Sequence, residues 1–415
     1  MQNHPAHQEP RRVLGSFFAP KSQNTPTWEQ RKLGDVADIV GGGTPSTNNP
    51  NYWDGDIDWY APAEIAGQIY FDSSQRKITE QGYENSSAKM LPPGTVLFTS
   101  RAGIGKTAIL SKKGCTNQGF QSIVPHNDEL DSYFVFSRTD ELKQYGELVG
   151  AGSTFVEVSG KQMAAMNLKM PTTIEEQQTI GRFFKRLDTL ITLHQRKYEK
   201  LVNIKKSMLD KMFPKNGASV PEIRFKGFTD LWEQRKFGEV VDKYEDPVET
   251  PHDGYYRLGI RSHAKGTFHS YVEKGHELET AQMYRVAAGN FIVNITFGWE
   301  HAVAITNESD AGKLVSHRFP QYSFHDDMLP EFFKYVIADE DFRHWLWLAS
   351  PGGAGRNRVL KLDEMLNYEM VLPSKEEQQR IAAIFRNLDT LVTLHQRKLE
   401  KLQNIKKSCL EKMFV

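Results

Sequence analysis

The feature that most constrains the fold is a segment of 39 residues that occurs twice in the chain. Residues 175–213 read EEQQTIGRFFKRLDTLITLHQRKYEKLVNIKKSMLDKMF and residues 376–414 read EEQQRIAAIFRNLDTLVTLHQRKLEKLQNIKKSCLEKMF, with 28 of 39 positions identical and no gap. A shorter match lies upstream, where WEQRKLGDVAD from Trp28 corresponds to WEQRKFGEVVD from Trp232. Because an internal repeat marks duplicated structural units, we expect two halves, about 28–213 and 232–414.

Between these matched ends the two halves share little sequence beyond a few passages of similar pattern. LPPGTVLFTSRAGIGKTAI (91–109) and VAAGNFIVNITFGWEHAVAI (286–305) both have the pattern of a strand, a turn and a returning strand. Matched ends impose a common framework with approximate two-fold symmetry, whereas dissimilar middle parts are free to present different surfaces. A chain of this design can recognise two targets at a fixed distance from each other.

Each copy of the repeat has the apolar spacing of a long coiled-coil helix. Apolar residues recur at alternating intervals of four and three, and Pro171 and Pro373 lie just before the two starts. At 1.5 Å per residue such a helix spans roughly 58 Å, so we expect the two helices to pair with each other. The positions predicted to form the helix–helix and partner interface are Ile180, Phe184, Leu187, Ile191, His194, Tyr198 and Leu201 in the first copy and Ile381, Phe385, Leu388, Val392, His395, Leu399 and Leu402 in the second.

Polar residues interrupt this seam at matched positions. They are His194 and His395, together with Lys205 and Lys406, and polar residues at such positions set the register or the number of partners. The alternative is a pair of ordinary amphipathic helices, each packed on its own domain. The apolar stripe is also wider than a two-stranded seam, which indicates additional helical partners; the residues that widen the first copy are Leu190, Leu193, Ile204 and Leu209.

The composition is that of a folded globular chain with room for two or three domains. Hydrophobic residues make up 39% and charged residues 25%, and the longest apolar runs fall far short of the roughly 18 residues that span a bilayer. The N-terminus lacks a charged segment followed by an apolar one. We therefore expect a cytoplasmic protein without a membrane partner.

Disulfides and metal sites are not expected. Cys115 and Cys409 lie far apart, and neither belongs to a C-x-x-C pair. The 13 histidines are scattered without the spacing of metal ligands, as in the group His252, His263, His269 and His276.

Positive charge is concentrated in the repeat although the formal net charge of the chain is zero. Residues 175–215 carry ten Lys or Arg against five Asp or Glu, and residues 376–415 carry eight against five. Subtracting both from the 52 basic and 52 acidic residues leaves 34 basic and 42 acidic residues elsewhere. The parts between the helices therefore have a net acidic excess.

The arrangement resembles the specificity subunit of type I restriction-modification systems over residues 28–414. The resemblance is carried by the two EEQQ…LDTL…LHQRK helices and the two WEQRK starts. Residues 1–27 depart from it, since they lack the PEIRFKGFTD-like segment that precedes Trp232. Further matching motifs are GGGTPST (41–47), YWDGDIDWYAP (52–62), TSRAGIGKTAI (99–109) and TNQGFQSI (116–123) in the first half and GIRSHAKGTFH (259–269), NITFGWEHAVAI (294–305) and LVSHRFP (314–320) in the second.

The resemblance implies an α+β (mixed) fold with two α/β target-recognition domains in a pseudo-two-fold repeat. A long helix follows each domain, and the two helices pair as an antiparallel coiled coil. The implied parts are the first domain (28–174), its long helix (175–213), a linker (214–231), the second domain (232–375) and its long helix (376–415). For residues 1–27, which depart from the family, we expect a disordered segment or an altered start.

The resemblance also implies a DNA-reading subunit with no catalytic residue of its own. Each domain would read one half of a bipartite site in double-stranded DNA, while the helices set the spacing and dock two methyltransferase subunits, which restriction subunits can join. S-adenosylmethionine, ATP and Mg²⁺ would belong to those partners, in keeping with the lack of N-P-P-[YF] and G-x-G-x-x-G motifs. Half-sites one DNA turn apart are separated by ~34–36 Å, which a helix pair of ~58 Å can bridge.

The stretch SRAGIGKT (100–107) is close to a nucleotide-binding loop. That loop requires G-x-x-x-x-G-K-[ST], but the first glycine is replaced by Ser100, and the corresponding passage of the second half carries Glu300 and His301 near the place of Lys106. We therefore interpret it as a strand, a glycine turn and a returning strand. An NTPase based on this stretch, and a coiled-coil adaptor that binds proteins but not DNA, are the alternative functions.

Base readout requires side chains such as Arg, Lys, Asn or Gln that reach the major groove, and glycine-flanked loops can place them. The strongest candidate is the run Arg356, Asn357 and Arg358, because it follows a glycine-rich bend. The residues predicted to contact DNA are Thr44, Ser46, Tyr52, Arg101, Lys106, Gln118, Gln121, Ser153 and Thr154 in the first domain and Arg257, Arg261, His263, Lys265, Asn294, Trp299, His317, Arg318, Arg356, Asn357 and Arg358 in the second.

Overall fold

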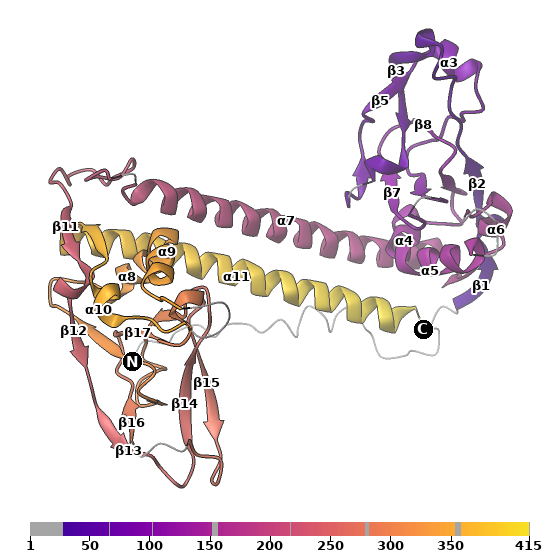
Figure 1. The fold of residues 1–415 in the computed structure, drawn as a ribbon. Coiled ribbons are helices and arrows are strands. Elements are labelled where there is room, and N and C mark those ends of the chain that lie inside the picture. The colour runs from indigo at the N-terminus through magenta and orange to yellow at the C-terminus, as the bar shows by residue number, and fades with distance from the viewer. Residues whose placement is uncertain are drawn as a thin grey trace, which may run out of the picture. The chain divides into compact units, whose positions relative to one another are not determined.

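The computed structural model describes residues 28–65, 67–101, 103–151, 157–215, 217–278, 282–352 and 358–414 (Figure 1). The predicted N-terminal segment 1–27 lies outside these ranges. Contacts divide the chain into two compact units. The first runs to His194 and takes in the end of the chain from Lys398, and the second comprises Gln195–Arg397. Each unit therefore combines one domain with parts of both long helices.

The domain of the first unit is built on two small sheets and a separate strand pair. Its strands are β1 (Trp28–Lys32), β2 (Ala37–Gly41), β3 (Trp53–Tyr60), β4 (Tyr70–Phe71), β5 (Arg76–Ile78), β6 (Val96–Phe98), β7 (Thr107–Leu110), β8 (Cys115–Thr116), β9 (Gln121–Pro125) and β10 (Asn167–Pro171). Its helices are α2 (Leu33–Val36), η1 (Pro50–Tyr52), η2 (Pro62–Glu64), α3 (Glu80–Glu84), α4 (Ser132–Ser137), α5 (Thr139–Gly150) and α6 (Gly160–Ala164). The sheet orders are β2-β9-β6-β7-β4 and β5-β3-β8, and β1 pairs with β10.

The domain of the second unit has the same plan with different sheets. Its strands are β11 (Glu233–Lys236), β12 (Val241–Tyr244), β13 (Pro247–Glu249), β14 (Tyr255–Ile260), β15 (Thr267–Val272), β16 (Gln282–Arg285), β17 (Phe291–Val293), β18 (Val303–Ile305), β19 (Leu314–Val315), β20 (Gln321–Phe324) and β21 (Glu369–Leu372). Its helices are η3 (Phe237–Glu239), η4 (Gly298–Glu300), α8 (Pro330–Val336), α9 (Glu340–Leu348) and α10 (Leu362–Leu366). The sheet orders are β12-β20-β17-β18 and β13-β16-β19-β14-β15, and β11 pairs with β21.

The strand–turn–strand passages predicted in the two halves are confirmed. Strands β6 and β7 pair antiparallel with Val96 opposite Ile109, and β17 and β18 pair antiparallel with Phe291 opposite Ile305. The two domains therefore share this hairpin even though its sequence differs between them.

The two long helices are α7 (Ile174–Met212) and α11 (Lys375–Met413). These bounds agree with the predicted spans 175–213 and 376–415 to within two residues. Each helix follows a strand that pairs antiparallel with the strand of the WEQRK motif, β10 with β1 and β21 with β11. Both carry two glutamates in the first turn and a lysine in the last, which complements the helix dipole.

In each unit the start of one long helix packs against the end of the other. Phe184 near the start of α7 belongs to the same hydrophobic core as Leu402 in the last turns of α11 and Phe414 just past its end. In the second unit Phe385 near the start of α11 shares a core with Met212 at the end of α7. The helix ends therefore meet in antiparallel sense in both units, whereas coiled-coil packing along the middle of the helices stays a prediction.

The seam residues become less buried toward the middle of the helices. Those nearest the helix starts, Ile180, Phe184, Leu187, Ile381 and Phe385, are buried in the two domain cores. Leu399 is buried, and the remaining seam residues are half-buried: Ile191, His194, Tyr198, Leu201, Leu388, Val392, His395 and Leu402.

A buried carboxylate holds the two helices together in the first unit. Asp188 of α7 accepts a hydrogen bond from the Lys406 ammonium group of α11 at 2.6 Å and another from the Tyr133 hydroxyl at 3.0 Å. Burial, followed by the Asp188 charge, raises the pKa of Tyr133 above its usual range. The phenol therefore stays protonated and can donate to the carboxylate.

The second unit repeats this arrangement. Asp389 pairs with Lys205 at 2.5 Å and accepts a hydrogen bond from the Tyr335 hydroxyl at 2.9 Å. Tyr133 is the second residue of α4, whereas Tyr335 is the sixth of α8, so the tyrosine lies one helical turn further along. The hydrogen bond from a tyrosine hydroxyl to the aspartate is thus present in both units, although the tyrosine comes from a different position of its helix. Its presence in both units indicates that it stabilises both frameworks.

Candidate DNA interface

In the first domain, three loops that are distant in sequence meet at one surface. They are the glycine-rich loop after β2, the β6–β7 loop and the β8–β9 loop. The Gly43 amide donates to the Thr116 carbonyl at 2.8 Å, and the Ser100 amide donates to the Gly119 carbonyl at 2.8 Å. A Cβ atom at Gly42 would lie within 2.5 Å of the backbone of the β8–β9 loop, so only glycine permits this close approach.

This junction brings together several residues predicted to contact DNA. Thr44 is hydrogen-bonded to the Gln118 side chain. The Arg101 guanidinium donates to the Gln118 carbonyl at 2.9 Å and pairs with Glu157 at 3.0 Å, so it is already engaged within the domain. The exposed Lys106 ammonium group has no hydrogen bond or ion pair with the described residues. Lys106 is therefore the cation of this junction most available to an anion.

The other predicted residues of the first domain are placed differently. Ser46 is exposed, but Tyr52 is half-buried and packs in a small cluster around β3. Gln121 is half-buried at the start of β9. Ser153 and Thr154 lie outside the described residues.

The stretch SRAGIGKT does not form a phosphate cradle. In a nucleotide-binding loop the backbone amides point at the phosphates, but here the Gly105 amide donates to the Thr99 carbonyl at 3.0 Å and the Lys106 amide to the Thr99 hydroxyl at 2.9 Å. Thr107 begins strand β7, and its hydroxyl lies 2.6 Å from that of Thr139. The amides and the hydroxyl that would bind phosphate and Mg²⁺ are thus used inside the domain, and only the Lys106 ammonium group is left for an anion.

In the second domain, four predicted residues surround one hollow of about 650 Å³. Arg257 lies on β14, Asn294 follows β17, and His317 and Arg318 follow β19. Neither arginine side chain has a hydrogen bond or ion pair with the part of the chain that the structure describes. Free guanidinium groups of this kind can form forked hydrogen bonds to a base edge or a phosphate.

Two exposed aromatic rings that line the same hollow were not predicted. Phe268 is 40% exposed and Phe297 is 38% exposed. Glu300, also on the lining, accepts a hydrogen bond from the Ser262 hydroxyl at 2.8 Å. For Phe268, the sequence offered one signal: an aromatic residue directly after the glycine turn in KGTF (265–268).

Three of the predicted residues lie in the tight β14–β15 turn. The Arg261 guanidinium donates to the Thr267 carbonyl and lies 5.2 Å from the centre of the Phe268 ring. His263 has a left-handed backbone with φ of 62°, and Lys265 is exposed. Lys265 is therefore exposed to solvent at the turn, whereas Arg261 stabilises the turn through its bond to Thr267.

The remaining predictions for the second domain are only partly described. Trp299 is half-buried, and its indole donates to the Thr296 carbonyl at 3.2 Å. Arg356 and Asn357, which the sequence ranked highest, lie outside the described residues. The Arg358 guanidinium lies 4.8 Å from the centre of a ring of Trp347.

His301 lies directly after η4 in the stretch NITFGWEHAVAI, and its contacts give it a structural role. Its side chain is 3% exposed, its backbone is left-handed with φ of 61°, and Nε2 lies 2.6 Å from the Ile337 carbonyl oxygen. Burial lowers the pKa of His301 below its usual value, an effect that the Ile337 hydrogen bond partly opposes.

This burial predicts a pH dependence of stability. The folded state disfavours protonation of His301, while the unfolded chain protonates it below about pH 6.5, so unfolding takes up protons at low pH. The stabilising contribution of neutral His301 to the free energy of unfolding is fully present above that pH. It is lost as the pH falls, by at most about 1.4 kcal/mol per pH unit. Urea unfolding from pH 7 to 5 should show a smaller loss in His301→Gln than in the parent chain. His317→Gln, at an exposed position, is the control and should retain the parent slope.

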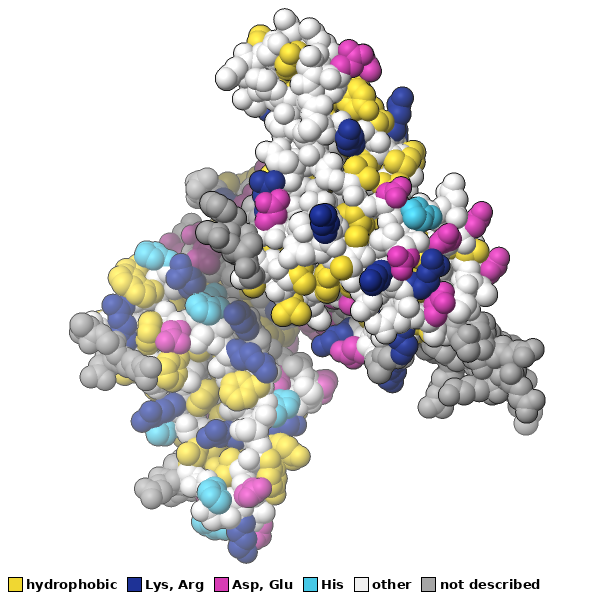
Figure 2. Space-filling model, turned by 90° about the vertical axis from the view of Figure 1, so that its right-hand side faces the viewer, with side chains coloured by type: hydrophobic (Ala, Val, Ile, Leu, Met, Phe, Trp, Pro, Cys, Tyr) yellow, Lys and Arg dark blue, Asp and Glu magenta, His cyan; other side chains and the backbone are white. Residues whose placement is uncertain are grey.

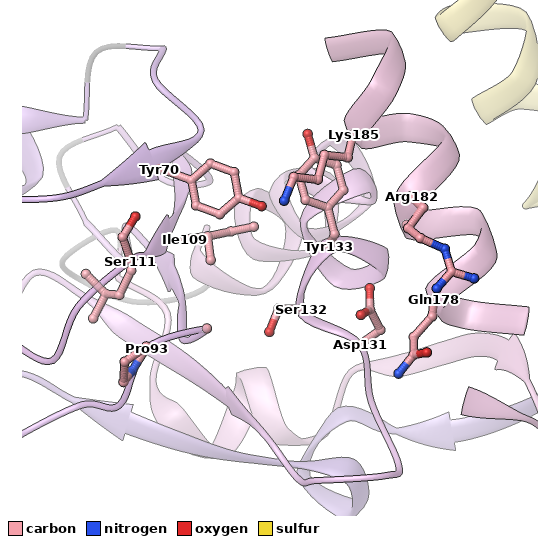
Figure 3. A pocket seen from close by; sticks show the side chains of 13 residues that line it. Tyr70, Pro93, Ile109, Ser111, Asp131, Ser132, Tyr133, Gln178, Arg182 and Lys185 are labelled. Atoms are coloured by element: carbon pink, nitrogen blue, oxygen red, sulfur yellow. The ribbon is translucent and has the colours of Figure 1, made fainter. Parts of the chain in front are cut away.

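A second kind of surface lies where each domain meets its long helix. In the first unit, a cavity of about 520 Å³ opens between Arg182 and Lys185 of α7 and the side chains of Tyr70, Asp131 and Tyr133 of the domain (Figure 3). Lys185 lies with its ammonium group 5.0 Å from the centre of the Tyr70 ring. Burial raises the pKa of Asp131. The helix therefore presents two cations to a partly aromatic hollow.

The second unit has a hollow at the corresponding place. It measures about 480 Å³ and is lined by Arg386 and Leu394 of α11 and by Lys334 and Tyr335 of α8. Arg386 occupies the position that Lys185 holds in the first copy of the repeat. A cationic hollow beside a tyrosine is thus a feature of both copies.

Two pairs of leucines on the long helices are exposed to nearly the same degree in the two copies. Leu190 and Leu391 are 42% and 41% exposed, and Leu193 and Leu394 are 44% and 43% exposed. These are two of the positions that widen the apolar stripe of the first copy. Their repetition marks an apolar surface that the described part of the chain leaves uncovered.

The described ranges contain no group of three His, Cys, Asp or Glu side chains that could hold a metal ion. Both cysteines are free, and burial raises the pKa of the Cys115 thiol to about 11. Among the described helices, none combines the length and apolar character needed to cross a bilayer.

The chain carries two different loop surfaces on one duplicated helical framework. A family model described as type I restriction modification DNA specificity domain matches residues 26–203 and again residues 263–404. The two matches take up most of the chain, so the chain belongs to this family, as the sequence predicts.

Individual relatives agree with this assignment. The type I restriction enzyme MjaIX specificity subunit of Methanocaldococcus jannaschii is 32% identical over 238 residues, 55% of each chain. The EcoR124I/EcoR124II specificity subunit of Escherichia coli is 28% identical over 190 residues, 41% of this chain and 46% of the relative. The chain thus matches about half the length of these relatives. The S subunit of a type I restriction-modification system from M. genitalium has the same fold, with a TM-score of 0.58, 12% identity and coverage of 95% of this chain and 98% of that one.

Proposed function

We propose that the chain is the DNA-specificity subunit of a type I restriction-modification complex. The observation that carries the proposal is that two matched helical frameworks support two loop surfaces whose residues differ. Residues 28–174 and 232–375 each read one half of a bipartite site in double-stranded DNA, the helices at 175–213 and 376–415 set the spacing, and residues 214–231 link the halves. The chain recognises its target and leaves the chemistry to its partners.

S-adenosylmethionine, ATP and Mg²⁺ are bound by the partner subunits in this proposal. The part of the chain that the structure describes offers no cluster of metal ligands, and the amides of its Gly-Lys-Thr stretch are satisfied within the domain. Both facts are compatible with a division of labour in which two methyltransferase subunits modify DNA and restriction subunits cleave it.

The two methyltransferase subunits dock on the surfaces that the repeat duplicates. Leu190 and Leu193 in one copy correspond to Leu391 and Leu394 in the other, with matched exposure. Arg196 and Arg397, and their neighbouring lysines, occupy equivalent positions beside these leucines. A partner helix with apolar side chains flanked by acidic ones fits each copy, and the repetition accounts for two partners of one kind.

High-affinity binding to DNA requires those partners. Neutralisation of phosphates supplies most non-specific affinity, but outside the long helices the chain holds 34 basic against 42 acidic residues. On the face that Figure 2 shows, Lys and Arg side chains are interspersed with Asp and Glu and are not gathered into one patch. We therefore expect the isolated chain to bind its site much more weakly than the assembled complex at the same salt concentration; equal affinity would contradict this.

The test of the proposed function is methylome sequencing of cells that express the chain together with its methyltransferase subunit. A bipartite methylated motif should appear, and exchanging residues 28–174 for the domain of another family member should change one half of the motif and leave the other intact. A motif that is continuous, or that changes in both halves, would refute the proposal. Cells that express the methyltransferase subunit alone are the control.

Arg318 is the residue of the second domain for which we predict base contact most directly, because its exposed guanidinium is unpaired within the described chain and borders the hollow. Arg318→Ala should reduce discrimination at one base position by about 1–3 kcal/mol. The measurement is binding of the assembled complex to duplexes that vary one base at a time in the second half-site. Arg343→Ala is the control, because Arg343 is paired with Glu340 in α9. Equal weakening on all duplexes would instead identify a phosphate contact.

Neither alternative function gains support from these observations. The hairpin at Lys106 uses its own amides, which argues against an NTPase. A protein adaptor without DNA binding would leave no footprint on a split DNA sequence when methyltransferase subunits are present, whereas the proposed function predicts one.

A further inference from the structure

The two frameworks correspond contact by contact where the WEQRK strand meets the long helices. The Trp28 indole donates to Glu176 in the first turn of α7 at 3.1 Å, and the Trp232 indole donates to Glu377 in the first turn of α11 at 3.2 Å. Phe414, just past the end of α11, lies beside Trp28, with ring centroids 5.8 Å apart. Each copy can therefore serve as the reference for the other.

One group breaks this correspondence. In the second copy, the Glu377 carboxylate is 1% exposed and receives two hydrogen bonds from Arg224, from Nε at 2.8 Å and from Nη2 at 2.7 Å. In the first copy, Glu176 accepts the Trp28 bond through Oε1, but its Oε2 is buried and accepts no hydrogen bond from the described residues. The first copy has the acceptor of a forked guanidinium contact without the donor.

The described part of the chain and the sequence give no obvious replacement for Arg224. Trp232 and Trp28 differ by 204 positions, so the ungapped counterpart of Arg224 is Pro20. The Arg138 guanidinium lies over the Phe414 ring, 4.8 Å from its centre. Its guanidinium is nevertheless occupied, because it donates to the Lys169 carbonyl and pairs with an acidic neighbour on α5.

In the second copy, the segment before Arg224 contacts the end of α7. The Ile223 amide donates to the Lys211 carbonyl at 2.9 Å, and the Lys211 ammonium group pairs with Glu222 at 2.6 Å. The end of α11 carries the equivalent surface in the first unit. The counterpart of Lys211 in the first unit is Lys412, within the identical sequence KMF that ends both copies. A segment that packed beside Trp28 in the way that residues 221–231 pack beside Trp232 would therefore meet equivalent groups on the helix end.

We propose that Glu176 and Trp28, together with the end of α11, form a receptor for an arginine side chain on an extended peptide segment. The ligand is a guanidinium group that donates to both carboxylate oxygens, as Arg224 does to Glu377. This site lies outside the loops assigned to DNA recognition, and only the choice of a methyltransferase subunit as donor rests on the proposed function. The donor is an arginine, either one of the two that precede Trp28, Arg11 and Arg12, or one of a methyltransferase subunit.

The receptor itself is tested by a transplant that needs no knowledge of the natural donor. Residues 16–27 are replaced by a copy of residues 220–231, which places arginine at position 20 in front of Trp28. Hydrogen–deuterium exchange of β1 and of the first turns of α7 should slow by at least about tenfold relative to the same transplant with glutamine at position 20. Exchange in β11 and the start of α11 is the internal control and should not change.

A Glu176→Gln substitution should abolish the difference between the arginine and glutamine transplants, because it removes the charge and keeps an acceptor for Trp28. Equal protection by the two transplants, or protection that survives Glu176→Gln, overturns the proposal. Glu377→Gln calibrates the effect, since it should speed exchange in β11 by removing the Arg224 contact.

The source of the natural donor is distinguished in the parent chain and in the complex. If the donor is in the chain, replacing Arg11 and Arg12 by glutamine will speed exchange in β1, with no further effect from Glu176→Gln. If the donor is in a partner, the double substitution will change nothing, and adding the methyltransferase subunit will slow exchange in β1 of the parent but not of Glu176→Gln. Failure of both arms overturns the proposal, and it would do so even if the methylome experiment succeeded.

Discussion

Replacing Phe184 by alanine is expected to lower the free energy of unfolding by about 4 kcal/mol, and Phe385→Ala should have an effect of similar size. Both rings are fully buried. Phe184 stacks on Phe414, with centroids 5.9 Å apart, and Phe385 lies 4.9 Å from Tyr335. Each substitution removes the ring that joins a domain core to both long helices and leaves a cavity that the rigid helices cannot collapse.

Urea unfolding followed by circular dichroism measures these losses, and exposed positions on the same helices supply the controls. Leu190→Ala and Leu391→Ala remove a side chain that is 42% or 41% exposed, so each should change the free energy of unfolding by no more than about 0.5 kcal/mol. If Phe184→Ala cost no more than Leu190→Ala, the start of α7 could not be part of the first core.

Lys406→Met is expected to destabilise the chain by about 3 kcal/mol, since removing one partner of a buried ion pair leaves an uncompensated charge. The Asp188 side chain is 8% exposed. Without the lysine, the hydrogen bond from the Tyr133 hydroxyl is the one that the described residues still give it. Methionine preserves most of the aliphatic stem, so the loss reports on charge more than on packing.

The matched substitution Lys205→Met should cost only about 1 kcal/mol, because its partner is more exposed and exposed pairs contribute little. The Asp389 side chain is 26% exposed and has a second cation, Lys334, at 3.7 Å. Urea unfolding measures the loss in free energy of unfolding for each variant. Equal losses would contradict the view that burial determines how much each ion pair stabilises the chain. Adding Asp188→Asn to Lys406→Met should recover part of the loss by removing the unpaired charge.

The helical framework was predictable from the sequence to within two residues at each end. A periodic apolar pattern of 39 residues, preceded by proline and repeated with 28 identities, leaves little choice of structure. The polar contacts across the framework were less predictable. Lys205 and Lys406 stood out as interruptions of the seam, but their carboxylate partners could not be found from spacing, because they lie on the opposite helix.

The loop surfaces were harder to predict, since tertiary contacts decide which side chains face outward. Arg101 has the right chemistry for DNA but is paired with Glu157, and Tyr52 packs into the cluster around β3. Phe268 and Phe297 were missed because a phenylalanine in a strand or loop is expected to be buried. Their exposure follows from the hollow that β14, β15 and the segments after β17 and β19 line together, which no local pattern encodes.

The sharing of the helices between the two units bears on the order in which the protein can be made. Domains usually fold as units from the N-terminus during synthesis. Here the first unit draws part of its core from Leu402 and Phe414, so the first unit cannot be complete until residues 402–414 have left the ribosome. The second unit needs only Gln195–Arg397, a continuous stretch, and is complete earlier. The domain that is translated first is therefore finished last.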